Sequence, residues 1–422
     1  MKTTAASASA RHVLTLMTGT SLAQAIALAV SPLLTRLYTP GQFGVYALYL
    51  SAVALLAIVA TGRYELAVVL PESDDDAWHV CALALLIALA VSALCVVGVW
   101  AFSGRIAAWA GDADLGGWLY LLPLAVLLTS VTNTLGCWAN RRQHYTQIAS
   151  NRLSQSATTA AASVGFGAAA QTGLGLVWAS VLGQGLSAAL FALGLRRDER
   201  VAAGGLKRET LRAQAARYIN FPRINLPHAL LDAAQASALL ALLGLTFGSG
   251  VLGLYAFALR IVKTPLGMLG SSVGQVFQQR AAQLYNDGGD LRGLVRRTTL
   301  RLAKLIVPFV ALMLVAPQLF AWLFGDGWRE AGVYALILTP WMALNFITSP
   351  LSQLPLIVGQ QARAFMYGLA YQASMLLPYA LAWAMHLDIL TALALQSALS
   401  SVVLVFYALW LHRLASSRPA HG

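Results

Sequence analysis

The chain has 422 residues, of which 58% are hydrophobic and only 10% are charged, and its formal net charge is +12. A soluble domain carries about 25% charged residues and has to cover itself with polar atoms. The composition therefore argues against a soluble fold and predicts an all-α protein that crosses a membrane many times. The positive charge is explained by topology, as shown below, so we expect no nucleic-acid partner.

The apolar runs predict about twelve membrane helices, because one crossing needs about 20 mostly apolar residues. The first run follows a short basic start and is too long for the apolar part of a signal peptide, so we expect it to be retained. The fifth run is rich in small residues, as is typical of closely packed membrane helices. The predicted spans are Val13–Thr35, Phe43–Gly62, Val80–Phe102, Trp118–Trp138, Leu153–Ala170, Leu174–Leu195, Leu226–Phe247, Val251–Phe277, Leu302–Phe324, Val333–Val358, Phe365–Met385 and Ile389–Leu411.

The three cysteines, Cys81, Cys95 and Cys137, lie in apolar runs and form no C-x-x-C pair. We interpret them as packing residues without a disulfide framework. The sequence predicts no metal site and no cofactor.

Lys and Arg are distributed unequally between the two sides of these spans. If the N-terminus is internal, the outer loops contain only Arg36, Arg105 and Arg329. Such a bias predicts that both termini are cytoplasmic. The densest basic stretch, Arg196–Arg223, is expected to contain a short amphipathic helix that contacts anionic lipid head groups. A role in gathering substrate is the alternative.

Two short patterns recur about half a chain length apart. Phe43-Gly-Val-Tyr-Ala-Leu48 resembles Leu252-Gly-Leu-Tyr-Ala-Phe257, and Gly111-Asp112 corresponds to Gly325-Asp326. The repeat predicts two six-helix halves around a central cavity, a common layout of transporters. We place the N-terminal lobe at 1–195, a basic cytoplasmic linker at 196–225 and the C-terminal lobe at 226–422.

Several segments are similar to the oligosaccharide flippases of the polysaccharide transporter family. They include Ser31-Pro-Leu-Leu-Thr-Arg-Leu-Tyr-Thr-Pro-Gly-Gln-Phe-Gly44, Gly62-Arg-Tyr-Glu-Leu-Ala-Val-Val-Leu-Pro71, Phe221-Pro-Arg-Ile-Asn225 and Gly253-Leu-Tyr-Ala-Phe-Ala-Leu-Arg260. The resemblance extends through nearly the whole chain. It implies the fold of the multidrug and lipid-linked oligosaccharide exporter superfamily.

The resemblance also implies a substrate and a location. Members of the family flip undecaprenyl-diphosphate-linked oligosaccharides from the cytoplasmic to the periplasmic leaflet of the bacterial inner membrane. The products enter O-antigen, capsule or exopolysaccharide assembly. A polysaccharide polymerase and a chain-length regulator are the expected protein partners, beside membrane lipids.

Ionisable side chains within spans are costly to keep there and are therefore candidate site residues. Arg260 and Lys263 are three residues apart and share one helix face. Lipid II flippases, which are distant relatives, carry a functional Arg in a similar segment. Arg260 is thus the best candidate for the diphosphate, because guanidinium groups fork onto phosphate oxygens while Lys acts as a point charge. The alternative is an ion pair between helices, such as Arg260 with Asp232.

Four further residues are weaker candidates. Arg63 and Glu65 lie at the inner end of the second span and either contact the substrate or pair with each other at the interface. Arg36 lies at the outer end of the first span, where release would occur or where it would anchor the helix. Asp232 is the acid well inside a predicted span, and it is either a coupling-ion site or a counter-ion.

Other functions are compatible with the hydropathy pattern. A membrane glycan polymerase or ligase would need a large outer loop with catalytic residues, and the predicted outer loops are short, so we do not expect an enzyme. A multidrug exporter of the same superfamily should favour carboxylates in its cavity, whereas the embedded charges here are mainly cationic. A lipid II flippase usually has fourteen spans. A scaffold would leave the buried charges without a role.

Overall fold

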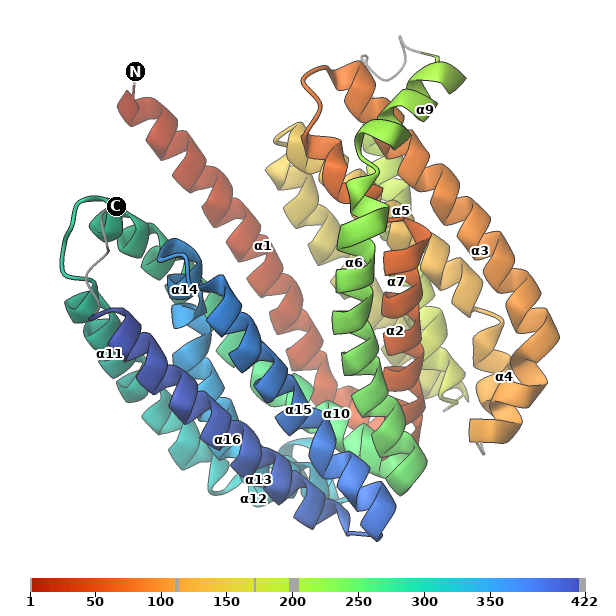
Figure 1. Ribbon diagram of the computed structural model, residues 1–422. Coiled ribbons are helices and arrows are strands. Elements are labelled where there is room, and N and C mark those ends of the chain that lie inside the picture. Colours follow the sequence, from red (N-terminus) through yellow and green to blue (C-terminus); the bar gives the residue numbers. More distant parts are fainter. Residues whose placement is uncertain (1, 111–113, 171, 197–204, 417–422) are drawn as a thin grey trace. The chain divides into compact units, whose positions relative to one another are not determined.

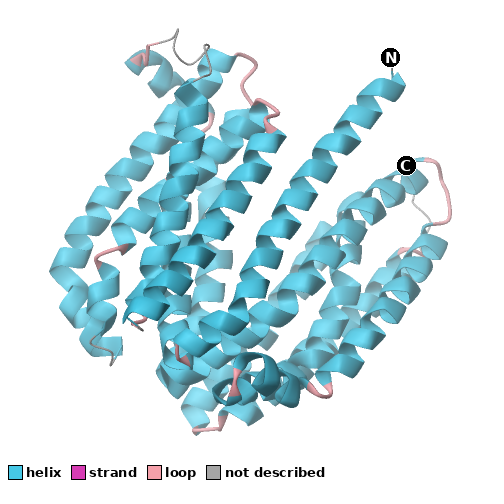
Figure 2. Ribbon diagram, turned by 180° about the vertical axis from the view of Figure 1, so that it is seen from behind, coloured by secondary structure: helices cyan, strands magenta, loops and turns pink. Residues whose placement is uncertain are grey.

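The computed structural model describes residues 2–110, 114–170, 172–196 and 205–416. Within these ranges all regular elements are helices, and no strand occurs (Figure 2). The chain forms two compact units, Met1–Leu240 and Ala241–Gly422. The lobe boundaries given above, 1–195 and 226–422, stay a prediction.

The described part of the first unit extends from α1 to the first part of α10 (Figure 1). Its elements are α1 (Lys2–Leu37), α2 (Pro40–Ala60), the 3₁₀ segment η1 (Tyr64–Val69), α3 (Asp74–Ala110), α4 (Asp114–Leu119), α5 (Leu122–Arg141), α6 (Tyr145–Ala170), α7 (Leu174–Arg196), α9 (Arg208–Arg217), the π-helical turn η2 (Phe221–Asn225) and the first part of α10 (Leu226–Asn286).

The second unit begins within α10 and continues to the C-terminus. Its further elements are α11 (Leu291–Met313), α12 (Ala316–Phe324), η3 (Asp326–Trp328), α13 (Arg329–Thr348), η4 (Ser349–Gln353), α14 (Leu354–Ile357), α15 (Gln361–Met385) and α16 (Ile389–Leu414).

The predicted multi-pass α-helical architecture is confirmed. Eight described helices are long and apolar enough to cross a membrane, or nine if α11 and α12, which are bent by 68° at their break, form one span. The long helix α10 is interrupted at Gly248, whose φ of 84° is not helical, so it comprises the predicted spans seven and eight. The remaining two, α6 and α15, are long enough but less apolar.

Two sequence predictions involve residues outside the described ranges. Of the predicted basic linker, residues 197–204 lie outside the described residues, whereas 208–217 form the short helix α9. The repeat element at 111–112 also lies outside the described residues.

Polar side chains define where several helices begin. Thr39 and Gln42 form a capping box at the start of α2, and Pro40 occupies its first turn, where a missing N–H costs nothing. Asp290 accepts the backbone N–H of Gly293 at 2.7 Å at the start of α11. Asp388 caps α16, and the hydrogen bonds from the Thr391 side chain and backbone hold the pKa of this exposed carboxyl below its usual value.

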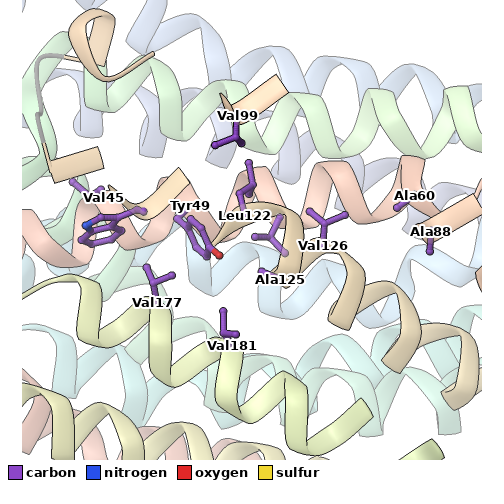
Figure 3. Close-up of a cluster of buried hydrophobic side chains, with 12 residues drawn as sticks. Val45, Tyr49, Ala60, Ala88, Val99, Leu122, Ala125, Val126, Val177 and Val181 are labelled. Atoms are coloured by element: carbon purple, nitrogen blue, oxygen red, sulfur yellow. The ribbon is translucent and has the colours of Figure 1, made fainter. Parts of the chain in front are cut away.

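One core of the first unit lies between α2, α3, α5 and α7 (Figure 3). Tyr49 of α2 packs there with Leu122 and Val126 of α5 and Val181 of α7. The buried residues of α2 in this core are spaced four or seven positions apart, so they form one stripe along the helix. Because lipid tails are as apolar as these side chains, close packing holds the bundle together.

The small residues of α6 have the predicted role. This helix packs along both α1 and α7. A Cβ atom added to Gly183 of α7 would lie 3.0 Å from the carbonyl oxygen of Gln155 in α6, closer than ordinary side-chain contacts allow. The Tyr38 hydroxyl, after α1, donates to the carbonyl of Ser163 at 2.7 Å. The fifth span is therefore an internal packing surface of the unit.

A glycine in α13 provides a test of this kind of packing in the second unit. A Cβ atom at Gly332 would lie 2.5 Å from the carbonyl oxygen of Ala316, which is backbone and cannot turn aside. We expect Gly332→Ala to lower the melting temperature of the purified protein by several degrees, since overpacking costs about 1–3 kcal/mol. Gly98→Ala in α3 is the control, because no atom lies within 4 Å of its added Cβ. Equal melting temperatures of the two variants would contradict the packing.

Candidate functional site

The backbone between α2 and η1 is the most unusual in the first unit. Gly62 has a φ of 57° and Arg63 a φ of 63°, so two consecutive residues are left-handed. Such a conformation is uncommon for a residue with a Cβ and costs about 1–2 kcal/mol. Strain of this kind persists only where other interactions fix the residue, and it often marks a functional position.

The Arg63 side chain connects two distant segments of the chain. Its Nε donates to the Asn225 side-chain oxygen at 2.9 Å, and its Nη1 lies 3.3 Å from Glu65 Oε1. The side chain of Glu65 is only 8% exposed and its second oxygen is buried without a hydrogen-bond partner among the described residues. The structure therefore shows the predicted pairing of Arg63 with Glu65, and it adds Asn225. Contact of either residue with a substrate remains a prediction.

Surrounding side chains hold this corner in place. Arg141, at the end of α5, donates to Asp74 at 3.1 Å and to the carbonyl of Pro71 at 2.7 Å. Arg142 bonds the other oxygen of Asp74 at 3.0 Å. The segment from η1 to α3 is thus clamped to the end of α5 by charge-assisted hydrogen bonds, which are stronger than neutral ones.

Helix α9 is attached to the same corner. Gln214 donates to Asp76 at 2.7 Å, and the Tyr64 hydroxyl donates to the carbonyl of Ala215 at 3.0 Å. Burial raises the pKa of the Tyr64 phenol, while Arg223 acts in the opposite direction. The phenol therefore stays protonated and remains a donor. Helix α9, in the described part of the basic segment, is therefore a structural part of the first unit.

The second candidate position is the turn of α10 that carries Arg260 and Lys263, called the cationic turn below. Lys263 Nζ lies 4.7 Å from the centre of the Trp341 ring, and the buried indole donates its N–H to the Tyr371 hydroxyl at 2.9 Å. A cation–π contact of this kind is worth about 0.5–2 kcal/mol. Arg260 is half-buried one turn earlier on the same face. The ammonium group of Lys263 is thus held against the aromatic ring of Trp341.

The second unit provides no carboxylate to neutralise these two cations within the membrane. From residue 241 onward the acidic residues are confined to the ends of helices: Asp287, Asp290, Asp326, Glu330 and Asp388. Neither cation forms an ion pair with a described residue of this unit. Within the described part of the second unit, no carboxylate therefore neutralises their positive charge.

The remaining two candidates both lie in the first unit. Arg36 is exposed in the last turn of α1. Asp232 lies 3.6 Å from His228, one turn earlier on α10, and both side chains are largely exposed. Asp232 belongs to the first unit and Arg260 to the second, and their pairing remains a prediction, as does a coupling role of Asp232.

Comparison with known proteins places this arrangement in context. The sequence model of the family described as polysaccharide biosynthesis protein matches residues 33–333. No curated protein matches the chain.

Solved structures of transporters are similar over nearly the whole length. An inward-facing multidrug resistance transporter of the MATE family, in the MOP superfamily, aligns with a TM-score of 0.65 at 15% identity, covering 96% of each chain. The lipid II flippase MurJ in its inward closed conformation aligns with a TM-score of 0.69 at 11% identity, covering 94% of this chain and 86% of that one. A MOP superfamily transporter from Pyrococcus furiosus gives 0.59 at 13% identity, covering 96% and 95%. At these identities the similarity shows the fold.

Proposed function

The chain belongs to the polysaccharide biosynthesis protein family and has the fold of MOP superfamily transporters, and on this premise we propose that it is a flippase for lipid-linked oligosaccharides. The substrate is an undecaprenyl-diphosphate-linked repeat unit, and the protein moves it from the cytoplasmic to the periplasmic leaflet. In this proposal the chain is a transporter and carries out no covalent chemistry.

The observation that carries the proposal is the cationic turn of α10 in a unit without membrane-embedded carboxylates. Moving a diphosphate and a sugar through hydrocarbon is costly, because ions and unpaired hydroxyls lose their hydration. A protein that carries such a head group needs fixed positive charge and polar groups along its path, while the polyprenyl tail stays in lipid. Arg260 and Lys263 supply that charge.

Each candidate has a proposed role. Arg260 forks onto the diphosphate and Lys263, held against Trp341, adds a point charge. Arg63 and Glu65 form the polar corner that the substrate meets near the cytoplasmic interface. Arg36 assists release at the other side.

Asp232 is proposed as the site of a coupling ion or as a counter-ion. It is the acid that the sequence places well inside a span, and a carboxylate at such a depth is costly unless it has a role.

The proposed location is the bacterial inner membrane, with both termini in the cytoplasm. The concentration of Lys and Arg in the predicted inner loops supports this orientation. The proposed partners are anionic membrane lipids, a polysaccharide polymerase and a chain-length regulator.

A deletion strain tests the function directly. We expect loss of the protein to leave completed, unpolymerised repeat units on undecaprenyl diphosphate, with the sugar facing the cytoplasm. The measurement is extraction of these lipids, combined with access of a membrane-impermeant sugar-modifying reagent to intact cells and to inverted vesicles.

A normal leaflet distribution, in a strain without a redundant transporter, would contradict the flippase proposal. Increased drug susceptibility of that strain would then favour the multidrug exporter alternative. Complementation with the unchanged gene is the control in both cases.

A further inference from the structure

A cavity of about 220 Å³ lies inside the second unit, between α13, α15 and α16. Its wall combines polar side chains from the end of α13 and from η4 with three tyrosines of α15 and α16. The residues used below are Asn345, Thr348, Ser352, Tyr367, Tyr371 and Tyr407. The cavity is separate from the cationic turn, but Tyr371 connects the two. Its hydroxyl accepts the N–H of Trp341, and the Trp341 ring contacts the ammonium group of Lys263.

The polar groups offer both donors and acceptors to a guest. Thr348 and Ser352 give their protons to the carbonyls of Leu344 and Ser349, at 2.9 and 2.7 Å, so their oxygens are left as acceptors. Tyr371 accepts from Trp341 and keeps its own proton to donate. The Asn345 amide makes no hydrogen bond within the described part of this unit and can both donate and accept. A ligand rich in hydroxyl groups matches this set.

Two of the tyrosines that line the cavity belong to a cluster of packed aromatic rings. Tyr367 stacks on Trp410 with ring centres 5.2 Å apart and planes 29° apart, and Tyr407 packs 5.3 Å from Tyr367. Such rings provide flat apolar surface that loses little conformational entropy on binding. The cavity therefore offers both hydrogen-bonding groups and flat apolar surface, the two kinds of contact that a sugar ring makes through its hydroxyls and its C–H groups.

Charge and size narrow the choice of ligand. None of the described residues that line the cavity is charged, and burying an unpaired ion there would be costly. Pockets for drug-sized molecules have about 300–1,000 Å³, so this smaller space matches a single sugar ring.

We propose that this cavity binds one neutral sugar ring. The inference rests on the proposed flippase function and deepens it, because it gives the carbohydrate head of the substrate a subsite apart from the cations that hold its diphosphate. The cavity would then contribute to the choice of repeat unit.

Saturation-transfer NMR with free sugars tests the site without any transport step. The purified full chain is held in a detergent that has no sugar head group and is titrated with glucose, galactose, mannose, rhamnose, N-acetylglucosamine and glucuronate. We expect transfer to the ring protons of at least one neutral sugar and at least tenfold weaker transfer to glucuronate. Absence of transfer to every neutral sugar would overturn the proposal, and so would equal transfer to glucuronate.

Matched variants locate the binding. Gly368 lines the cavity and has no atom within 4 Å of an added Cβ, so Gly368→Leu fills the space without a backbone clash and should abolish transfer. Tyr371→Phe and Asn345→Ala each remove one hydrogen-bonding group and should weaken affinity about fivefold. Gly165→Leu is the control, because Gly165 also lies in a helix with open space around its added Cβ, in the first unit.

Saturation transfer that persists in the Gly368→Leu variant would also contradict the proposal that the sugar binds in this cavity. The result is distinguishable from failure of the flippase function. If no neutral sugar binds but the deletion strain accumulates cytoplasm-facing repeat units, the sugar-site proposal is wrong and the flippase proposal is supported.

Discussion

Arg260→Ala is expected to abolish export of the repeat unit while the protein remains at its normal level in the membrane. The residue is half-buried on α10 and has no carboxylate partner in its unit, so its removal leaves no opposite charge unpaired there. A hydrogen bond to a charged group contributes about 1.5–3 kcal/mol. Loss of even one to the diphosphate should reduce transport at least about tenfold.

The measurement is complementation of the deletion strain, scored by surface polysaccharide and by accumulated lipid-linked repeat unit, with an immunoblot of the membrane fraction. Arg260→Lys should recover part of the activity, because it keeps the charge but loses the forked geometry. Arg280→Ala is the matched control, since Arg280 is an exposed Arg near the end of the same helix. Full export by Arg260→Ala would remove this residue from the site.

The multi-helix architecture was predictable because it follows from the length and spacing of apolar runs along the sequence. A run of about 20 apolar residues has few alternatives to a membrane helix. The fifth predicted span, Leu153–Ala170, lies within α6, and its small residues are packed against α1 and α7. Composition therefore identified its role even though its hydropathy is weak.

The boundaries were less accurate where polar signals define them. We predicted that the third span begins at Val80, but α3 begins at Asp74, and its first turn carries three aspartates that favour a helix N-terminus. The ninth span was predicted as Leu302–Phe324, whereas the structure has two helices there, α11 and α12, with a bend of 68° between them. Pro317 in the first turn of α12 was the available signal, since Pro is favoured at that position.

The site was only partly predictable. Arg63 and Glu65 are two residues apart and could be paired from the sequence, but Asn225 is 162 positions away from Arg63 and no periodicity connects them. The clamp of Arg141 and Arg142 on Asp74 had a usable signal, because a basic helix end and an acidic run are complementary. The cavity lined by Tyr371 was not predicted, because its residues come from α13, η4, α15 and α16 and the sequence does not indicate which faces meet.

The second large effect is expected at the Arg63 corner, and it concerns stability. Arg63→Ala removes the cation from Glu65, whose side chain is 8% exposed and whose second oxygen already lacks a partner. Breaking a buried pair from one side costs about 3–5 kcal/mol. Because Arg63 itself is 24% exposed, we expect the lower end, about 3 kcal/mol, and a melting temperature lowered by several degrees. Ala has a Cβ like Arg, so the left-handed backbone is equally strained in both proteins and the difference reports the side chain.

A double-mutant cycle separates the charge pair from general disruption. Glu65→Gln removes the buried charge and leaves Arg63 with solvent and Asn225, so it should cost less than Arg63→Ala. The double variant Arg63→Ala with Glu65→Gln should recover most of the stability lost in Arg63→Ala, because no buried charge is then left unpaired. Additive losses in thermal unfolding of the detergent-solubilised protein would show that the pair is not coupled. The strained conformation of Arg63 would then have to be maintained by the Asn225 hydrogen bond and the clamp on α3 alone.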